Sequence, residues 1–151
     1  MSIDKENILV ICRQNVGRSQ MGEGFLKVLT TNNPNISVAS AGLDVRGMRE
    51  KYQNHPHPQV IAVMQEEGVD ISQQSIKQID LKMLQNATRI AVLVKKTELP
   101  DYFREFRQKT VIIPIEDPAP GSEQEVPNLE LMQRYARDQI KQAMHQLVGY
   151  I

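Results

Sequence analysis

The chain has 151 residues, enough for one well-buried hydrophobic core and too few for two ordinary domains. Its 18 basic and 18 acidic side chains give a formal net charge of zero, so no field of one sign favours nucleic acid or a membrane surface as a partner. The polar N-terminus predicts no signal peptide, no run approaches the roughly 20 apolar residues of a membrane span, and one cysteine forms no internal disulfide, so we expect a cytoplasmic protein.

Short apolar runs alternate with helix-like segments from the start of the chain. Residues 6–11 contain an uninterrupted apolar run, which predicts a buried strand. Apolar residues then recur at helical spacing from Ser19 until Pro34 ends the pattern, and residues 36–40 predict a second strand. A strand, a helix and a strand in this order form a βαβ unit, in which the two strands are parallel.

The rest of the chain continues this alternation. We expect a polar loop at 43–55, strands at 89–94 and 111–115, and helices that begin near Pro58, Ile79, Pro100 and Pro127, the last reaching Val148. The predicted fold is one domain over residues 1–151, an α/β three-layer sandwich with helices on both faces of a four-stranded parallel sheet. In such sheets, ligands bind beyond the carboxyl ends of the strands.

The only cysteine lies in a glycine-containing turn between the first strand and the first helix. The stretch reads Cys12-Arg13-Gln14-Asn15-Val16-Gly17-Arg18-Ser19. Backbone N–H groups converge on an anion where such a loop leads into a helix N-terminus. A helix N-terminus and a nearby guanidinium also favour a thiolate over a thiol. The stretch therefore predicts a thiolate nucleophile at the floor of an oxyanion-binding loop.

The residue types in this loop suit that chemistry. Arg18 can hold two oxygens of a tetrahedral anion through its planar guanidinium, and Ser19 is placed to donate a hydrogen bond to the thiolate. Asn15 tolerates a left-handed backbone, and Gly17 allows the backbone to approach the anion. The alternative is that Cys12 is a small apolar residue at a strand end and Arg18 a solvated helix residue. We predict that Cys12 and Arg18 are catalytic and that the anion is bound by Arg13, Gln14, Asn15, Val16, Gly17, Arg18 and Ser19.

Hydrolysis by a thiolate also needs a group that protonates the leaving oxygen. Asp117 follows the fourth predicted strand, which places it on the same rim of the sheet as Cys12, and Pro118 and Pro120 stiffen its loop. We predict that Asp117 is the general acid. The alternatives are a turn-forming Asp-Pro pair without a catalytic role and Glu116 as a weaker competitor.

Other polar residues carry weaker signals. His55-Pro56-His57 has two possible metal ligands, but a third is missing nearby, so we predict a surface loop there, no metal site and no cofactor. Tyr52 is the aromatic residue that the sequence places near the mouth of the site. The arginines at 46 and 49, with Arg13, either make this mouth basic or form a solvated face.

With these residues assembled, the chain resembles the low-molecular-weight protein tyrosine phosphatase family, which includes the thioredoxin-type arsenate reductases. Cys12, Arg18 and Ser19 match the signature Cys-x5-Arg-Ser, and Asp117-Pro118 is similar to the family's acid loop. The resemblance implies that Cys12 attacks phosphorus to form a cysteinyl-phosphate while Asp117 protonates the leaving oxygen. Asp117 would then activate the water that releases phosphate, while Arg18 and the loop amides hold the equatorial oxygens.

Departures from the family pattern bear on the substrate. Phosphatases of this family often have an aromatic residue after Asp-Pro and a second cysteine in the loop, where this chain has Ala119 and Gly17. The stretch from Arg18 to Leu26 is closer to the arsenate reductase branch, which relays electrons through two further cysteines. This chain lacks both cysteines, so arsenate reduction would require an external thiol.

We therefore predict a cysteine-dependent phosphomonoesterase, similar to protein tyrosine phosphatases, that acts through a cysteinyl-phosphate. Its expected partners are a phosphorylated protein or a small aryl phosphate, and inorganic phosphate or similar oxyanions. The alternatives are an arsenate reductase that uses an external thiol donor and a non-catalytic oxyanion-binding module.

Overall fold

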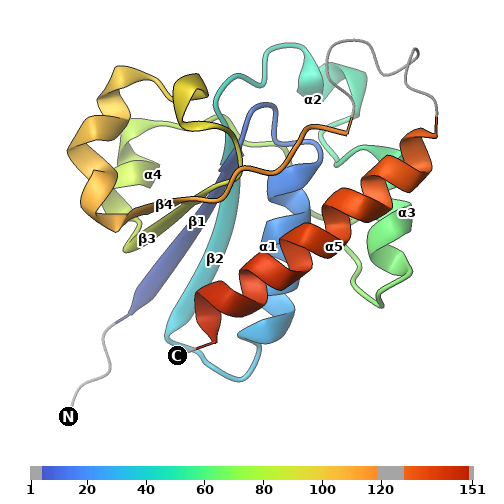
Figure 1. Ribbon diagram of the computed structural model, residues 1–151, viewed down its shortest axis with the longest axis horizontal. Coiled ribbons are helices and arrows are strands. Elements are labelled where there is room, and N and C mark those ends of the chain that lie inside the picture. The colour runs from blue at the N-terminus through green and yellow to red at the C-terminus, as the bar shows by residue number, and fades with distance from the viewer. Residues whose placement is uncertain (1–4, 119–127, 150–151) are drawn as a thin grey trace.

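Four parallel strands form one sheet in the order β2-β1-β3-β4 in the computed structural model of the chain, described over residues 5–118 and 128–149 (Figure 1). The strands are β1 (Glu6–Cys12), β2 (Ile36–Gly42), β3 (Arg89–Val92) and β4 (Thr110–Ile112). Since β1 has a neighbour on each side, its carboxyl end is held by pairing of Cys12 with Gly42 and of Ile11 with Val92. The cysteine thus emerges from an inner strand.

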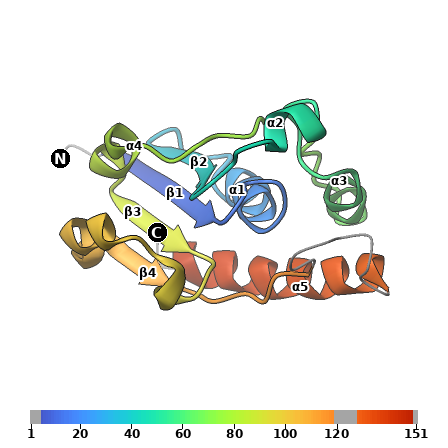
Figure 2. The same ribbon diagram turned by 90° about the horizontal axis from the view of Figure 1, so that it is seen from above.

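Helices cover both faces of the sheet. One face carries α1 (Arg18–Leu29), α3 (Pro58–Gln65) and α5 (Leu129–Val148), and the other carries α4 (Leu81–Asn86) and a 3₁₀ helix over Asp101–Lys109. Figure 2 shows the sheet between these two groups. This arrangement confirms the predicted fold class, a single-domain α/β fold with a four-stranded parallel sheet.

Successive side chains of a strand point to opposite faces of the sheet, so the core is divided into two layers. Ile8 and Val10 of β1 pack in the cluster that contains Met21 of α1. Leu9 and Ile11 point to the opposite face and pack in the cluster that contains Leu84 of α4 and Phe103. Because β1 is apolar on both faces, it is buried by both layers, as the uninterrupted apolar run predicted.

Several predicted boundaries differ from those observed. The segment 43–55, expected to be a loop, contains the short helix α2 (Met48–Lys51), which follows Gly47 in the left-handed region with φ of 78°. The segment expected as a short helix from Pro100 is a 3₁₀ helix. Regular strand structure in β4 ends at Ile112, although the N–H groups of Ile113 and Ile115 still donate to carbonyls of Val92 and Leu93. The predicted helix start at Pro127 lies outside the described residues.

Within residues 5–118 and 128–149, no helix has both the length and the apolar character needed to cross a membrane.

Candidate active site

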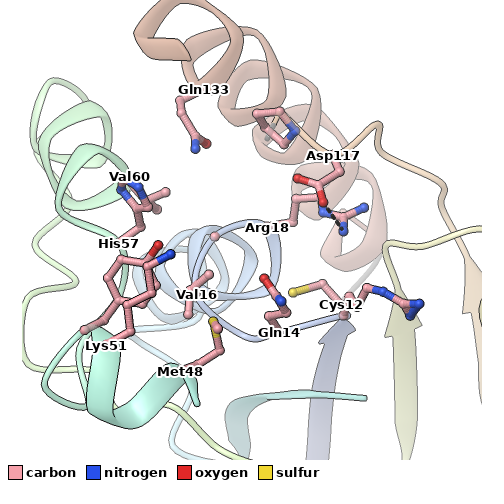
Figure 3. A pocket seen from close by; sticks show the side chains of 14 residues that line it. Cys12, Gln14, Val16, Arg18, Met48, Lys51, His57, Val60, Asp117 and Gln133 are labelled. Carbon is pink, nitrogen blue, oxygen red and sulfur yellow. Dashed lines mark ion pairs between the residues drawn. The ribbon is translucent and has the colours of Figure 1, made fainter. Parts of the chain in front are cut away.

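The loop after β1 forms the floor of a hollow at the carboxyl ends of the strands (Figure 3). Segments that are distant in the sequence form its walls. The lining consists of Cys12, Arg13, Gln14, Val16, Gly17 and Arg18 from the loop and the start of α1, Met48, Lys51 and Tyr52 from α2 and its end, His57 and Val60 at the start of α3, Asp117 and Pro118 after β4, and Gln133 from α5. The structure therefore brings Cys12, Arg18 and Asp117 to one hollow.

Cys12 is buried, and its sulfur contacts a hydroxyl group. Cys12 Sγ lies 2.9 Å from Ser19 Oγ, and Asn15 Nδ2 donates to the same Ser19 oxygen at 2.7 Å. Because an amide nitrogen can only donate, Ser19 Oγ is the acceptor from Asn15, and its own hydrogen can be directed at the sulfur. Ser19 is therefore placed to donate a hydrogen bond to the sulfur of Cys12.

Asn15 holds the loop from below. Its φ of 57° confirms the predicted left-handed conformation, and its side chain is fully buried. Asn15 Nδ2 also donates to Ser40 Oγ of β2 at 2.9 Å, while Oδ1 accepts from Gln20 Nε2 at 3.0 Å and from the backbone N–H of Lys77 at 2.8 Å. The side chains of Asn15 and Ser19 thus lie beneath the loop, and any contribution of these two residues to anion binding would come from their backbone.

A second set of buried polar groups supports Ser40. Ser40 Oγ donates to Glu23 Oε1 at 2.5 Å, and Glu23 is also paired with Lys27 at 2.6 Å and Lys77 at 3.5 Å. Burial lowers the pKa of Lys77, and the Glu23 carboxylate opposes this shift. The loop is therefore tied to α1, to β2 and to the segment at Lys77.

Arg18 is fixed in position by backbone carbonyls. Its side chain is 7% exposed, and Nη1 donates to the carbonyl of Ile115 at 2.8 Å and to that of Leu93 at 3.4 Å. Nη2 lies 3.7 Å from Asp117 Oδ2. The guanidinium is thus held between the ends of two strands with one edge toward the hollow, as binding of an oxyanion requires. Asp117 lies on the rim where the parallel-strand argument placed it.

One wall of the hollow is formed by residues that the sequence left as loop. The rings of Tyr52 and His57 lie 5.2 Å apart at 42°, and Lys51 Nζ lies 5.3 Å from the Tyr52 ring centroid. His57 Nδ1 accepts from the N–H of Gln59 and so caps α3. Both histidines lie outside regular helices and strands; His55 is exposed, whereas His57 is partly buried and lines the hollow. Among residues 5–118 and 128–149, no three His, Cys, Asp or Glu side chains are grouped so that they could hold a metal ion.

The basic residues of the predicted mouth lie in different surroundings. Arg13 lines the hollow. Arg46 instead pairs with Asp44 at 2.6 Å and lowers the pKa of Asp44 to about 2, and Arg49 donates to the carbonyl of Ile76. Sequence reasoning missed Met48, Lys51, Val60 and Gln133, which lack a motif or a spacing that would have indicated them.

The chain is similar to known proteins over nearly its whole length. A sequence model of the family described as "Low molecular weight phosphotyrosine protein phosphatase" matches residues 7–151. The chain belongs to this family. The structure of this chain is similar to that of Vibrio vulnificus Wzb in complex with benzylphosphonate. The two chains are 25% identical, with a TM-score of 0.79, and the match covers 97% of this chain and 99% of the Wzb chain.

Two curated relatives carry a different activity in their names. The chain is 37% identical to a glutaredoxin arsenate reductase of Synechocystis sp. over 75 residues, which are 50% of each protein. It is 32% identical to an arsenate reductase of Staphylococcus aureus over 95 residues, which are 63% of this chain and 65% of the relative. The chain thus matches between half and just under two thirds of the length of these relatives.

Proposed function

We propose that this protein is a cysteine-dependent phosphomonoesterase. The observation that carries the proposal is the meeting of Cys12, Arg18 and Asp117 in one hollow, with the Ser19 hydroxyl beside the sulfur. A thiolate, a fixed guanidinium and a carboxyl group are the three groups that a two-step hydrolysis through a covalent intermediate requires. The family of the chain supports the same chemistry.

The first step transfers the phosphoryl group to the enzyme. The Cys12 thiolate attacks phosphorus, an S–P bond forms, and the bond from phosphorus to the leaving oxygen breaks as Asp117 donates a proton to that oxygen. Arg18 and the backbone N–H groups of residues 13–18 hold the three remaining phosphoryl oxygens, whose charge they stabilise. The product of this step is an alcohol or a phenol.

The second step releases phosphate. The Asp117 carboxylate takes a proton from a water molecule, the water oxygen attacks phosphorus, and the S–P bond breaks. Cys12 leaves as a thiolate, which Ser19 stabilises, and inorganic phosphate is the product. The lining by Tyr52, Val60 and Met48 supports an aryl group as part of the substrate, either a small aryl phosphate or a phosphorylated side chain of a protein.

Hydrolysis of p-nitrophenyl phosphate in the presence of a metal chelator tests the proposal. We expect turnover by the native protein, none by Cys12→Ser, and a rate about 10²- to 10⁴-fold lower in Asp117→Asn, because that variant loses the general acid. Asp101→Asn is the matched control, since Asp101 is fully exposed in the 3₁₀ helix. An undiminished rate in Cys12→Ser would contradict the proposal.

Arsenate reductase activity is a second candidate, supported by the names of the curated relatives. Arsenate has the shape and charge of phosphate, so the same loop could hold it. Cys12 would replace one arsenate oxygen, which leaves as water, and an external thiol would then attack the Cys12 sulfur. A disulfide forms as arsenic is reduced and released as arsenite, and a second external thiol regenerates Cys12.

The same protein preparation separates the two candidates. Arsenite formation from arsenate is measured with glutathione and glutaredoxin as donors, with Cys12→Ser as the blank. Production of arsenite without turnover of any aryl phosphate would replace the first candidate by the second. Turnover of the aryl phosphate without arsenite would remove the second.

A further inference from the structure

Gln133 is a buried polar side chain that faces the hollow from α5. It lines the hollow together with Cys12, Arg18 and Asp117, and in Figure 3 its amide points inward across the hollow from Gln14. Only 5% of the residue is exposed, so water reaches little of it. Gln133 is therefore part of the wall and not of the outer surface.

The carbonyl oxygen of this amide lacks a partner among residues 5–118 and 128–149. Gln133 Oε1 is buried and accepts no hydrogen bond from any described residue. A buried acceptor without a donor is costly, and native proteins keep few of them. Where such an oxygen faces a binding hollow, the missing donor is expected to arrive with the ligand.

The phosphoryl group itself cannot be this donor. Its oxygens accept hydrogen bonds, and in this site they would be matched by Arg18 and by the loop N–H groups. A carbonyl oxygen would be repelled by them. Two kinds of donor remain for Gln133 Oε1: an N–H or O–H group of the leaving group, and the water molecule that attacks phosphorus in the second step. Only the first kind would make Gln133 discriminate between phosphate esters.

The position of Gln133 is fixed by the packing of its helix. One turn further along α5, Arg137 Nη1 donates to the carbonyl of Val63 at 2.9 Å and to Glu66 Oε1 at 2.6 Å. Ala136 and Ile140 are buried in the core shared with α1 and α3. The amide of Gln133 thus projects from a helix that is held in place. A fixed position of this kind is needed if a side chain is to discriminate between similar substrates.

We propose that Gln133 is a specificity-determining residue whose side-chain oxygen accepts a hydrogen bond from an N–H or O–H group of the leaving group. The site then prefers phosphate esters that carry such a donor over esters of the same shape that lack it. A site built to accept a hydrogen bond rejects an analogue without the donor, because the buried acceptor stays unpaired. This inference rests on the proposed phosphatase activity.

A matched substrate pair tests the inference. One ester is acetamidophenyl phosphate, with the amide at the meta or the para position in turn, and the other is the same compound with the amide nitrogen methylated. Methylation removes the N–H donor and also adds a methyl group, so the comparison is made as a ratio between the native protein and each variant. The measured quantity is the ratio of kcat/KM for the N–H ester to that for the N-methyl ester. For at least one position we expect this ratio to fall about three- to tenfold from the native protein to Gln133→Met.

Two further variants show that the effect belongs to the acceptor. Gln133→Glu keeps an acceptor oxygen at this position and is expected to retain the preference for the N–H ester, even where its negative charge slows both esters. Gln142→Met makes the same substitution at an exposed position of α5 and is expected to keep the native ratio. Thermal unfolding of each variant checks that the fold is intact.

An unchanged ratio in Gln133→Met at both positions would overturn the inference. An equal loss of rate for the N–H and N-methyl esters would also overturn it, because it would assign Gln133 to the attacking water. A native protein that hydrolyses neither these esters nor p-nitrophenyl phosphate would remove the proposed function and this inference with it. Hydrolysis of p-nitrophenyl phosphate without hydrolysis of either ester, or hydrolysis of both esters with an unchanged ratio, would remove the inference alone.

Discussion

Replacing Asn15 with alanine is expected to lower the stability and the activity of the protein together. The side chain makes three buried hydrogen bonds, with Ser19, Ser40 and Gln20, and a partly buried one with the N–H of Lys77. At about 1 kcal/mol net for each bond, their loss lowers the free energy of unfolding by about 4 kcal/mol. The left-handed backbone adds about 1 kcal/mol for alanine.

Urea unfolding of two variants separates these contributions. Asn15→Ala should lose about 5 kcal/mol in the free energy of unfolding, a large share of the roughly 5–15 kcal/mol of a typical domain. Asn15→Gly should lose about 1 kcal/mol less, because glycine adopts the left-handed region without strain. Asn32→Ala, in an exposed turn, should change stability by less than about 0.5 kcal/mol.

Activity gives an independent measurement of the same contact. Without Asn15, the Ser19 hydroxyl is no longer fixed toward the Cys12 sulfur, so kcat/KM for p-nitrophenyl phosphate should fall about tenfold or more under conditions where the variant is folded. A loss of stability below about 1 kcal/mol in Asn15→Ala would refute the hydrogen-bond argument. Equal stability of the alanine and glycine variants would refute the argument from backbone strain.

Two other predictions concern the packing of the loop and the effect of pH. A Cβ added at Gly42 would lie 2.8 Å from the carbonyl carbon of Gln14, so Gly42→Ala should displace the cysteine loop and lower kcat/KM at least tenfold. Ser37→Ala, on the same strand, should leave kcat/KM unchanged. Native activity in Gly42→Ala would contradict this packing argument. The arginines of α5 that donate to Glu66 lower its pKa from 4.5 to about 2, so its contribution to stability is complete above about pH 4.5 and is lost as the pH falls toward 2. The melting temperature of Glu66→Gln should therefore lie below the native value at pH 7 and approach it at pH 2; a constant difference between the two would show that Glu66 does not act through its charge.

The sequence was most informative about the site where a motif could be combined with the rule that parallel strands end on one rim of the sheet. The apolar run of β1 and the spacing from Cys12 to Arg18 defined the loop, and the rule that parallel strands end on one rim brought Asp117 to it. Lys51, His57 and Gln133 could not be placed in this way. They lie on a four-residue helix, at a helix cap and on an otherwise ordinary polar position of α5, where neither periodicity nor motif indicates which side chain faces the hollow. Their position depends on how α2, α3 and α5 pack, which only the tertiary structure supplies.

The floor and the far wall of the hollow rest on separate supports. The floor is held by Asn15 and its partners in α1 and β2, whereas the wall with Gln133 is held where Arg137 joins α5 to Val63 and Glu66 of α3 and the turn after it. These two sets of hydrogen bonds share no residue. On the proposed roles of Cys12 and Gln133, relatives with an identical cysteine loop could diverge in what they accept through changes at the α3–α5 junction.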